Sequence, residues 1–334
     1  MIIRQRIVRV RREYNQWVAN ETLEDYALRF TAKSARRWSA ARVANTALGA
    51  ISFLALEAIG GTITLEYGFT NAVAAILLVS ALIFVTAVPI SYYAARCGVD
   101  IDLLTRGAGF GYIGSTITSL IYASFTFLFF AIEAVILASM LDACFGIPLW
   151  IGYVLCTVAV VPLVTHGITL ISRFQLWTQP AWIVLHILPF GFIAFQGVTP
   201  FTSWTGFHGP MGEAAGSLQI GLFGAAASVV FSLIAQIGEQ VDYLRFLPPK
   251  PDPAAPFRAR AAWWCALLAG GPGWIVPGML KLLAGSFLAT LAVGHGLPAA
   301  EAAMPTQMYE VAFGYVVASP TLALALAASF VLIS

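Results

Sequence analysis

The sequence predicts an all-α integral membrane protein. Of its 334 residues, 59% are hydrophobic and only 10% are charged, and the mean hydropathy is +0.83. A water-soluble domain needs more polar surface than this composition supplies. The apolar residues also gather in segments of about 20 or more, long enough to cross a bilayer as helices. Soluble enzymes, nucleic-acid-binding proteins and disulfide-rich secreted proteins are therefore all but excluded.

The chain opens with a polar, basic arm over residues 1–42. The arm has no apolar core of the kind that marks a cleavable signal peptide, so we expect it to stay in the cytoplasm. Residues 43–334 form the predicted transmembrane domain. Its apolar segments cover residues 43–66, 71–94, 113–141, 148–168, 178–197, 217–241, 263–293 and 308–334.

Lysine and arginine fall on one side of these predicted spans. With the N-terminus inside, 17 of the 18 basic residues lie in the arm or in the inner loops 95–112, 169–177 and 242–262. The outer loops hold acidic residues instead. This asymmetry is typical of a multi-pass protein of the inner (plasma) membrane with a cytoplasmic N-terminus.

The last two spans differ from the others. Residues 270–278 of the seventh contain four glycines and two prolines, which predict a kink or a short helix on the inner side. The eighth runs to Ser334 with no flanking charge. We therefore expect the protein to be C-terminally incomplete here.

Four ionisable residues lie at membrane depth: Glu57, Glu133, Glu239 and Lys281. Each costs about 2.5–3.5 kcal/mol on insertion scales, so each is a candidate for function. For Glu57 and Glu133 the alternative is a structural carboxyl that pairs with Lys281 or stays protonated. For Glu239 the alternative is a side chain that reaches the inner interface.

Two spans carry candidate helix breaks beside these carboxyls. Glu57 is followed by Gly60 and Gly61 in span one, and Gln236 precedes Gly238 and Glu239 in span six. Spans five apart cross the membrane in opposite senses, which indicates an inverted repeat with repeat one at 43–197 and the start of repeat two at 217–334. Broken helices in matching places of two repeats are typical of transporter binding sites.

Other motifs carry no function. A glycine pattern of the dinucleotide-binding type, at residues 109–114, opens a membrane span instead of following a strand. The four histidines lack ligand spacing, and the four cysteines are scattered. We therefore expect no cofactor and no metal site beyond a coupling ion.

Four stretches together resemble the nucleobase:cation symporter family, whose permeases carry cytosine, purines, uracil, thiamine, allantoin and hydantoins. They are Glu24–Phe30, Gly98 with Leu103–Arg106, Gly109–Ser115 and Asp242–Pro248. The resemblance implies a LeuT-like fold of two inverted five-helix repeats plus two extra helices. Of these twelve helices the chain would supply about eight.

The resemblance also implies site residues. Phe129 would stack on a planar solute, where the family usually has Trp, and Glu133 one turn later would bind its polar edge. Gln236 from span six and Gly60 and Gly61 from span one would complete the substrate site. The resemblance also puts Ser334 at the edge of a Na⁺ site. The carboxyl of Glu57 is an addition to the family pattern; as a buried ionisable group it would serve the coupling cation or proton, and Glu239 and Lys281 are secondary candidates.

The sequence thus favours a symporter of the plasma membrane that moves a nucleobase-like or related small nitrogen-containing solute, driven by Na⁺ or H⁺. Such a protein has a small molecule and the lipid bilayer as partners, binds no nucleic acid and is not an enzyme. The alternative is a transporter-like input module of a membrane histidine kinase. In that case a cytoplasmic signalling region follows Ser334.

Overall fold

The computed structural model describes residues 31, 36, 38–165 and 168–334, and every regular element in this part of the chain is a helix. Most of the predicted arm, with residues 20–22 and His166, lies outside the described residues. The helices before the long outer loop are α2 (Ala40–Gly49), α3 (Ala55–Cys97), α4 (Ile101–Thr105), the π-helical η2 (Arg106–Phe110), α5 (Gly111–Phe145), α6 (Leu149–Thr165) and α7 (Ile168–Phe195). After them come α8 (Thr199–Thr205), η3 (Gly209–Gly216), α9 (Ile220–Phe231), η4 (Ser232–Gln236), α10 (Ile237–Leu244), α11 (Phe257–Gly270), η5 (Pro272–Trp274), α12 (Ile275–Gly294), α13 (Ala299–Ala302), α14 (Pro305–Gly314) and α15 (Pro320–Ile333).

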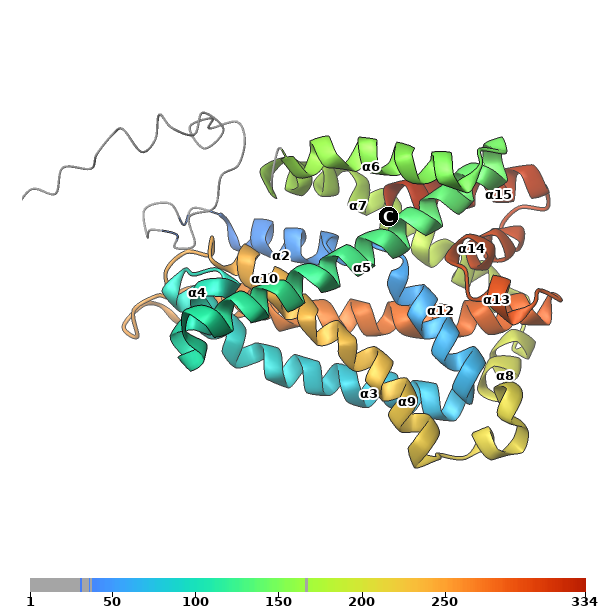
Figure 1. Cartoon of the computed structure of the whole chain (residues 1–334), viewed down its shortest axis with the longest axis horizontal. Coiled ribbons are helices and arrows are strands. Elements are labelled where there is room, and N and C mark those ends of the chain that lie inside the picture. The colour runs from blue at the N-terminus through green and yellow to red at the C-terminus, as the bar shows by residue number, and fades with distance from the viewer. Residues whose placement is uncertain (1–30, 32–35, 37, 166–167) are drawn as a thin grey trace, which may run out of the picture.

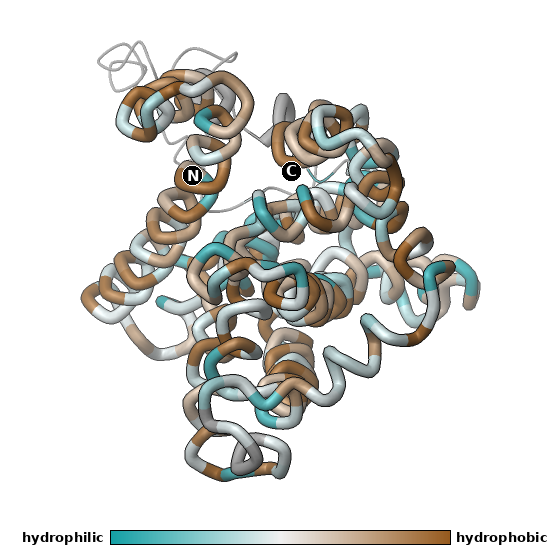
Figure 2. Tube along the Cα trace, turned by 90° about the vertical axis from the view of Figure 1, so that its right-hand side faces the viewer, coloured by the Kyte–Doolittle hydropathy of each residue, from teal (hydrophilic) through white to brown (hydrophobic). Residues whose placement is uncertain are grey.

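Helices of membrane-spanning length dominate the described residues. Five are long and apolar enough to cross a bilayer: Ala55–Cys97, Ile101–Phe145, Phe174–Phe195, Ile220–Leu244 and Pro272–Gly294. Large apolar side chains such as Phe195 (90% exposed) and Val85 (68%) also cover the outside. Figure 2 shows hydrophobic residues on outer helices as well as in the interior. Because such a surface suits lipid and not water, the protein is a multi-pass membrane protein.

The first predicted span is interrupted. Its second part and the whole of the second predicted span form one long helix, α3. Helix α2 ends at Gly49, α3 begins at Ala55, and residues 50–54 between them are non-helical. Within α3 the backbone leaves the helical region at Gly68, where φ is 77°. Glycine reaches that conformation without steric cost. The two segments of α3, residues 55–67 and 69–97, therefore run in different directions (Figure 1).

Spans three to five are α5, α6 and α7. Helix α7 begins at Ile168, so the inner loop predicted at 169–177 is wrong, because these residues are helical. The stretch contains neither glycine nor proline, and a single arginine does not end a helix. The apolar run marks the lipid-facing length of a span, whereas its helix continues beyond it.

Span six is not a uniform α-helix. Helices α9 and α10 are separated by the five-residue 3₁₀ stretch η4, which includes Gln236. Span seven is also divided: α11 ends at Gly270, the chain turns at Gly271, and α12 begins after η5. The predicted interruption of span seven is confirmed. The predicted break of span six at residues 236–239 is wrong, because η4 and α10 continue α9 as one helical span over Ile220–Leu244.

The predicted eighth span at 308–334 is wrong. Residues 305–314 form α14 and residues 320–333 form the separate helix α15, with residues 315–319 between them. Pro320 stands at the start of α15, where proline is tolerated because the first helical residues need no N–H donor. Apolar composition alone did not reveal this helix boundary.

Helices α3 and α12 form the centre of the molecule. In the most apolar 18-residue stretch of α12, 72% of residues are buried, against 33% or less in the other four long helices. Gly60 and Gly61 of α3 and Gly285 of α12 line their contact. A Cβ on Gly60 would lie 1.9 Å from the Leu282 carbonyl oxygen, and one on Gly285 would lie 2.0 Å from the Glu57 carbonyl oxygen. Glycine thus allows the two backbones to touch.

Candidate functional site

The first helix break, defined here as residues 50–54, presents backbone groups that no helix satisfies. The ammonium Nζ of Lys281 donates to the Ser52 carbonyl oxygen over 2.8 Å. The Ser52 hydroxyl donates to the Ser334 carbonyl oxygen, also over 2.8 Å. The Lys281 side chain of α12 therefore replaces the helical bond that the Ser52 carbonyl lacks, and the Ser52 hydroxyl ties the break to the residue after α15.

Glu57 lies in the first turn of α3 and is fully buried, with 0% exposure. Its Oε1 is 3.0 Å from Lys281 Nζ, and Lys281 is 1% exposed. Tyr309 donates to the same oxygen over 3.3 Å, and its hydroxyl is 2.9 Å from His186 Nδ1. We call Glu57, Lys281, Tyr309 and His186 the buried polar cluster. It joins α3, α12, α14 and α7.

Aromatic rings enclose the buried polar cluster. Trp182 stacks on His186 with ring centroids 5.2 Å apart, and Lys281 Nζ lies 4.8 Å from the Trp182 ring centroid. Phe330 of α15 packs on Tyr309 at 4.3 Å. Such rings exclude water while still attracting the ammonium through their π faces. The charged pair is therefore held in a low-dielectric setting.

The two predicted substrate residues of α5 both face the first helix break. Glu133 Oε1 accepts a hydrogen bond of 2.7 Å from the Ala55 amide, at the first residue of α3. Phe129, one turn earlier, packs edge-on against Phe53 with centroids 5.3 Å apart. A carboxylate at a helix N-terminus satisfies a free N–H and complements the helix dipole. An aromatic face and a carboxylate thus border the same break.

The residues of span six lie apart from these contacts. Gln236, 2% exposed, donates to Glu239, and the Tyr243 hydroxyl donates to the other oxygen of Glu239. All three residues stand on η4 or α10. The described contacts do not join Glu239 to the buried polar cluster, so its carboxylate is satisfied within its own helix.

The predicted break of span one at Gly60 and Gly61 is wrong. Gly60 and Gly61 lie inside α3, and the irregular backbone is found at residues 50–54. A Cβ on Gly61 would lie 2.5 Å from the Met308 methyl carbon. These glycines serve close helix packing instead of unwinding, and that packing brings Lys281 beside Glu57. Their predicted role in substrate binding stays a prediction.

Sequence reasoning missed three members of this region: His186, Tyr309 and Trp182. His186 has no metal-ligand spacing, and no group of His, Cys, Asp and Glu that could hold a metal ion occurs among the described residues. Its partner Tyr309 is 123 residues away in the chain. A polar ring inside an apolar span was the one available signal for His186.

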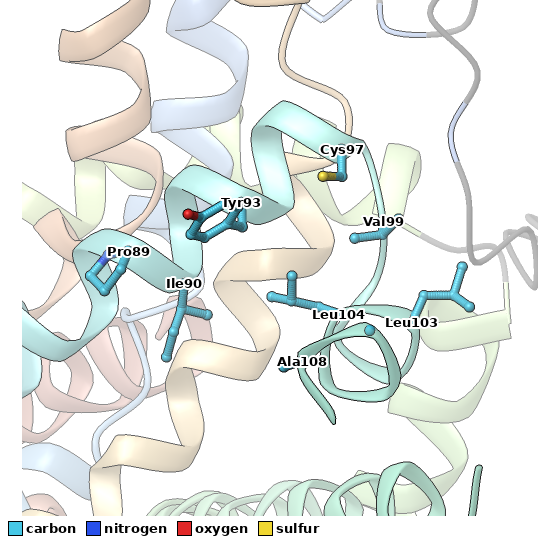
Figure 3. A pocket seen from close by; sticks show the side chains of 9 residues that line it. Pro89, Ile90, Tyr93, Cys97, Val99, Leu103, Leu104 and Ala108 are labelled. Atoms are coloured by element: carbon cyan, nitrogen blue, oxygen red, sulfur yellow. The ribbon is translucent and has the colours of Figure 1, made fainter. Parts of the chain in front are cut away.

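A pocket of about 560 Å³ lies elsewhere in the fold. Pro89, Ile90, Tyr93 and Cys97 of α3 face Leu103, Leu104 and Ala108 across it (Figure 3). The lining side chains are almost all apolar and come from the end of α3 remote from Glu57. We therefore place the candidate site at the first helix break and not in this pocket.

No family model and no curated protein matches the chain. Among solved structures, it is similar to Mhp1, a nucleobase-cation-symport-1 family transporter, in a closed conformation with bromovinylhydantoin bound. The TM-score is 0.55 at 14% sequence identity, over 93% of this chain and 74% of that one. At this identity the likeness shows the fold alone. The chain therefore has an all-α, LeuT-like transporter fold.

Proposed function

We propose that this protein is a secondary transporter that moves a small, planar, nitrogen-containing solute across the membrane by alternating access. The observation that carries the proposal is the position of Phe129 and Glu133 beside the first helix break. The fold of a nucleobase-cation symporter supports it. Broken helices at mid-membrane are where such transporters bind their solutes.

In this proposal Phe129 packs against the face of the solute and Glu133 accepts its N–H groups. Gln236 adds an amide from span six. Glu133 is now bonded to the Ala55 amide and Gln236 to Glu239, so the solute must replace or share these bonds. Glu57 serves the coupling ion, Na⁺ or H⁺, and the N-terminus is cytoplasmic.

Uptake into proteoliposomes tests the proposal. Labelled cytosine, uracil, hypoxanthine, allantoin and a hydantoin are offered with Na⁺ and pH gradients imposed separately. We expect saturable, gradient-driven accumulation of at least one of them. Specific binding without accumulation would favour a ligand sensor instead, and neither binding nor uptake would contradict this solute class.

The Glu133→Gln variant tests the assigned site. Glutamine keeps an oxygen for the Ala55 amide but loses the negative charge, so folding is retained while solute affinity falls at least tenfold, about 1.4 kcal/mol. Isothermal titration of purified protein measures this. Glu301→Gln, an exposed carboxyl in α13, is the matched control and leaves affinity unchanged. Equal affinity of Glu133→Gln and wild type removes Glu133 from the site.

A further inference from the structure

We infer that the ammonium of Lys281 is a built-in cation that occupies the ion position at the first helix break, so that no Na⁺ binds there. The inference rests on the proposed function in one respect: of the two coupling ions proposed for Glu57, it excludes Na⁺ and leaves H⁺. The geometry itself concerns three groups: the Ser52 carbonyl, the Glu57 carboxylate and Lys281 Nζ.

The first helix break supplies the oxygens that a monovalent cation needs. A carbonyl freed from helical bonding and a buried carboxylate are ligands that broken membrane helices offer to Na⁺. Lys281 Nζ already holds both of them, at 2.8 Å from Ser52 O and 3.0 Å from Glu57 Oε1. A sodium ion bound to the same two oxygens would overlap the ammonium.

Two oxygens and an aromatic ring hold the ammonium. It has three N–H donors; two reach Ser52 and Glu57, and the Trp182 ring lies below it at 4.8 Å. The side chain is 1% exposed, so water does not compete. A second cation at this position would meet strong repulsion in a low dielectric.

The polar groups that surround the ammonium come from four other helices, and Glu57 pairs with it directly. Glu57 of α3 is the direct partner, while Glu133 of α5 is bonded to the Ala55 amide and Tyr309 of α14 and His186 of α7 stand behind Glu57. One oxygen of Glu57, Oε2, has no hydrogen-bond partner among the described residues. Once the ammonium is removed, Glu57 therefore has oxygens to offer an ion.

Na⁺-dependent thermal stability in detergent tests the inference, at constant ionic strength with choline as the replacement cation. Wild type should show no change in Tm between 0 and about 100 mM Na⁺. Lys281→Met, which keeps the chain length and removes the charge, should gain about 2–4 °C from Na⁺. Glu57→Gln combined with Lys281→Met removes both charges and should lose this gain.

The matched control is Lys250→Met, because Lys250 is an exposed lysine that contacts Tyr92 outside the site. It should behave as wild type. A Na⁺-dependent rise of Tm in wild type, or none in folded Lys281→Met, would overturn the inference. Direct binding of ²²Na⁺ gives a second readout: wild type should show none, and saturable binding to wild type that Glu57→Gln abolishes would refute the inference.

These measurements need no transport activity. Failed solute uptake with this pattern of Na⁺ effects would refute the proposed function and leave the cation assignment in place. Successful uptake with Na⁺ stabilisation of the wild type would support the proposed function and refute the cation assignment.

Discussion

The carboxylate of Glu57 and the ammonium of Lys281 neutralise each other where neither reaches water. We predict that Glu57→Gln leaves the ammonium unpaired and lowers the stability of the fold by about 3–5 kcal/mol. The double variant Glu57→Gln with Lys281→Met should lose less, since it leaves no buried charge. Thermal melting of the purified proteins measures both. Glu57→Gln melting at the wild-type temperature would show that the pair is not the stabilising contact.

In the buried polar cluster the sequence predicted the charged residues but not their partners. Glu57, Glu133 and Lys281 stood out because a charge inside an apolar run is rare and costly. Their partners did not. Tyr309 lies 252 residues from Glu57, and nothing local indicates that its hydroxyl turns toward that carboxylate. The Ser52 carbonyl accepts the Lys281 ammonium because the backbone is non-helical there, and no residue type in the sequence predicts this break.

At the scale of elements, the contact of α3 with α12 sets the distance between Glu57 and Lys281. We predict that Gly60→Ala forces the helices apart, since its Cβ would lie 1.9 Å from the Leu282 carbonyl oxygen. The expected loss of stability is about 1–3 kcal/mol. Gly224→Ala, in α9 with nothing within 4 Å of the new methyl group, is the matched control and should be neutral or slightly stabilising. Equal melting temperatures for the two variants would contradict this packing.

The C-terminal end of α3 is capped by Arg36, which the sequence analysis counted only as one of the basic residues of the arm. Arg36 donates to the carbonyl oxygens of Thr31, Ala95 and Cys97, and so satisfies the last turn of the helix. Burial lowers the pKa of its guanidinium from the ordinary value, although an arginine stays charged at physiological pH.

We predict that Arg36→Met frees these carbonyls and speeds hydrogen exchange at residues 94–98 by about tenfold or more. Arg96→Met, which removes an exposed arginine from the same turn, is the matched control and should leave the exchange unchanged. Mass spectrometry of deuterated peptides reports both. Equal protection in Arg36→Met and wild type would show that the turn needs no cap.

Helix boundaries could be predicted where glycine and proline interrupt a helix, and could not be predicted where tertiary packing sets the boundary. Glycines and prolines at 270–278 indicated the interruption before α12, and it is present. The Gly60–Gly61 pair indicated a break that the structure places at residues 50–54, because glycine serves close packing as readily as unwinding. The apolar segment around residues 315–319 predicts one continuous span, whereas the structure ends α14 there and begins α15.

At the scale of the whole molecule, composition and spacing were enough for the class and most of the spans. What they could not supply is which spans lie side by side, since lipid and protein interior favour the same apolar residues. The central position of α12 is an example: its sequence is no more apolar than that of α5, yet far more of it is buried. Hydropathy does not give the arrangement of the helices, and the structure shows that this arrangement is similar to that of a solved transporter.

Orientation in the membrane is a prediction of the whole chain, because it depends on the sum of its loops. With 17 of 18 basic residues on one side, moving them across the bilayer is strongly disfavoured. We predict that Lys250→Cys, in a background without other cysteines, reacts with a membrane-impermeant maleimide only after cells are opened. Ser203→Cys in α8 should react in intact cells. Both positions are exposed, so accessibility differs only by side. Labelling of Lys250→Cys in intact cells would invert the topology and place the basic loops outside.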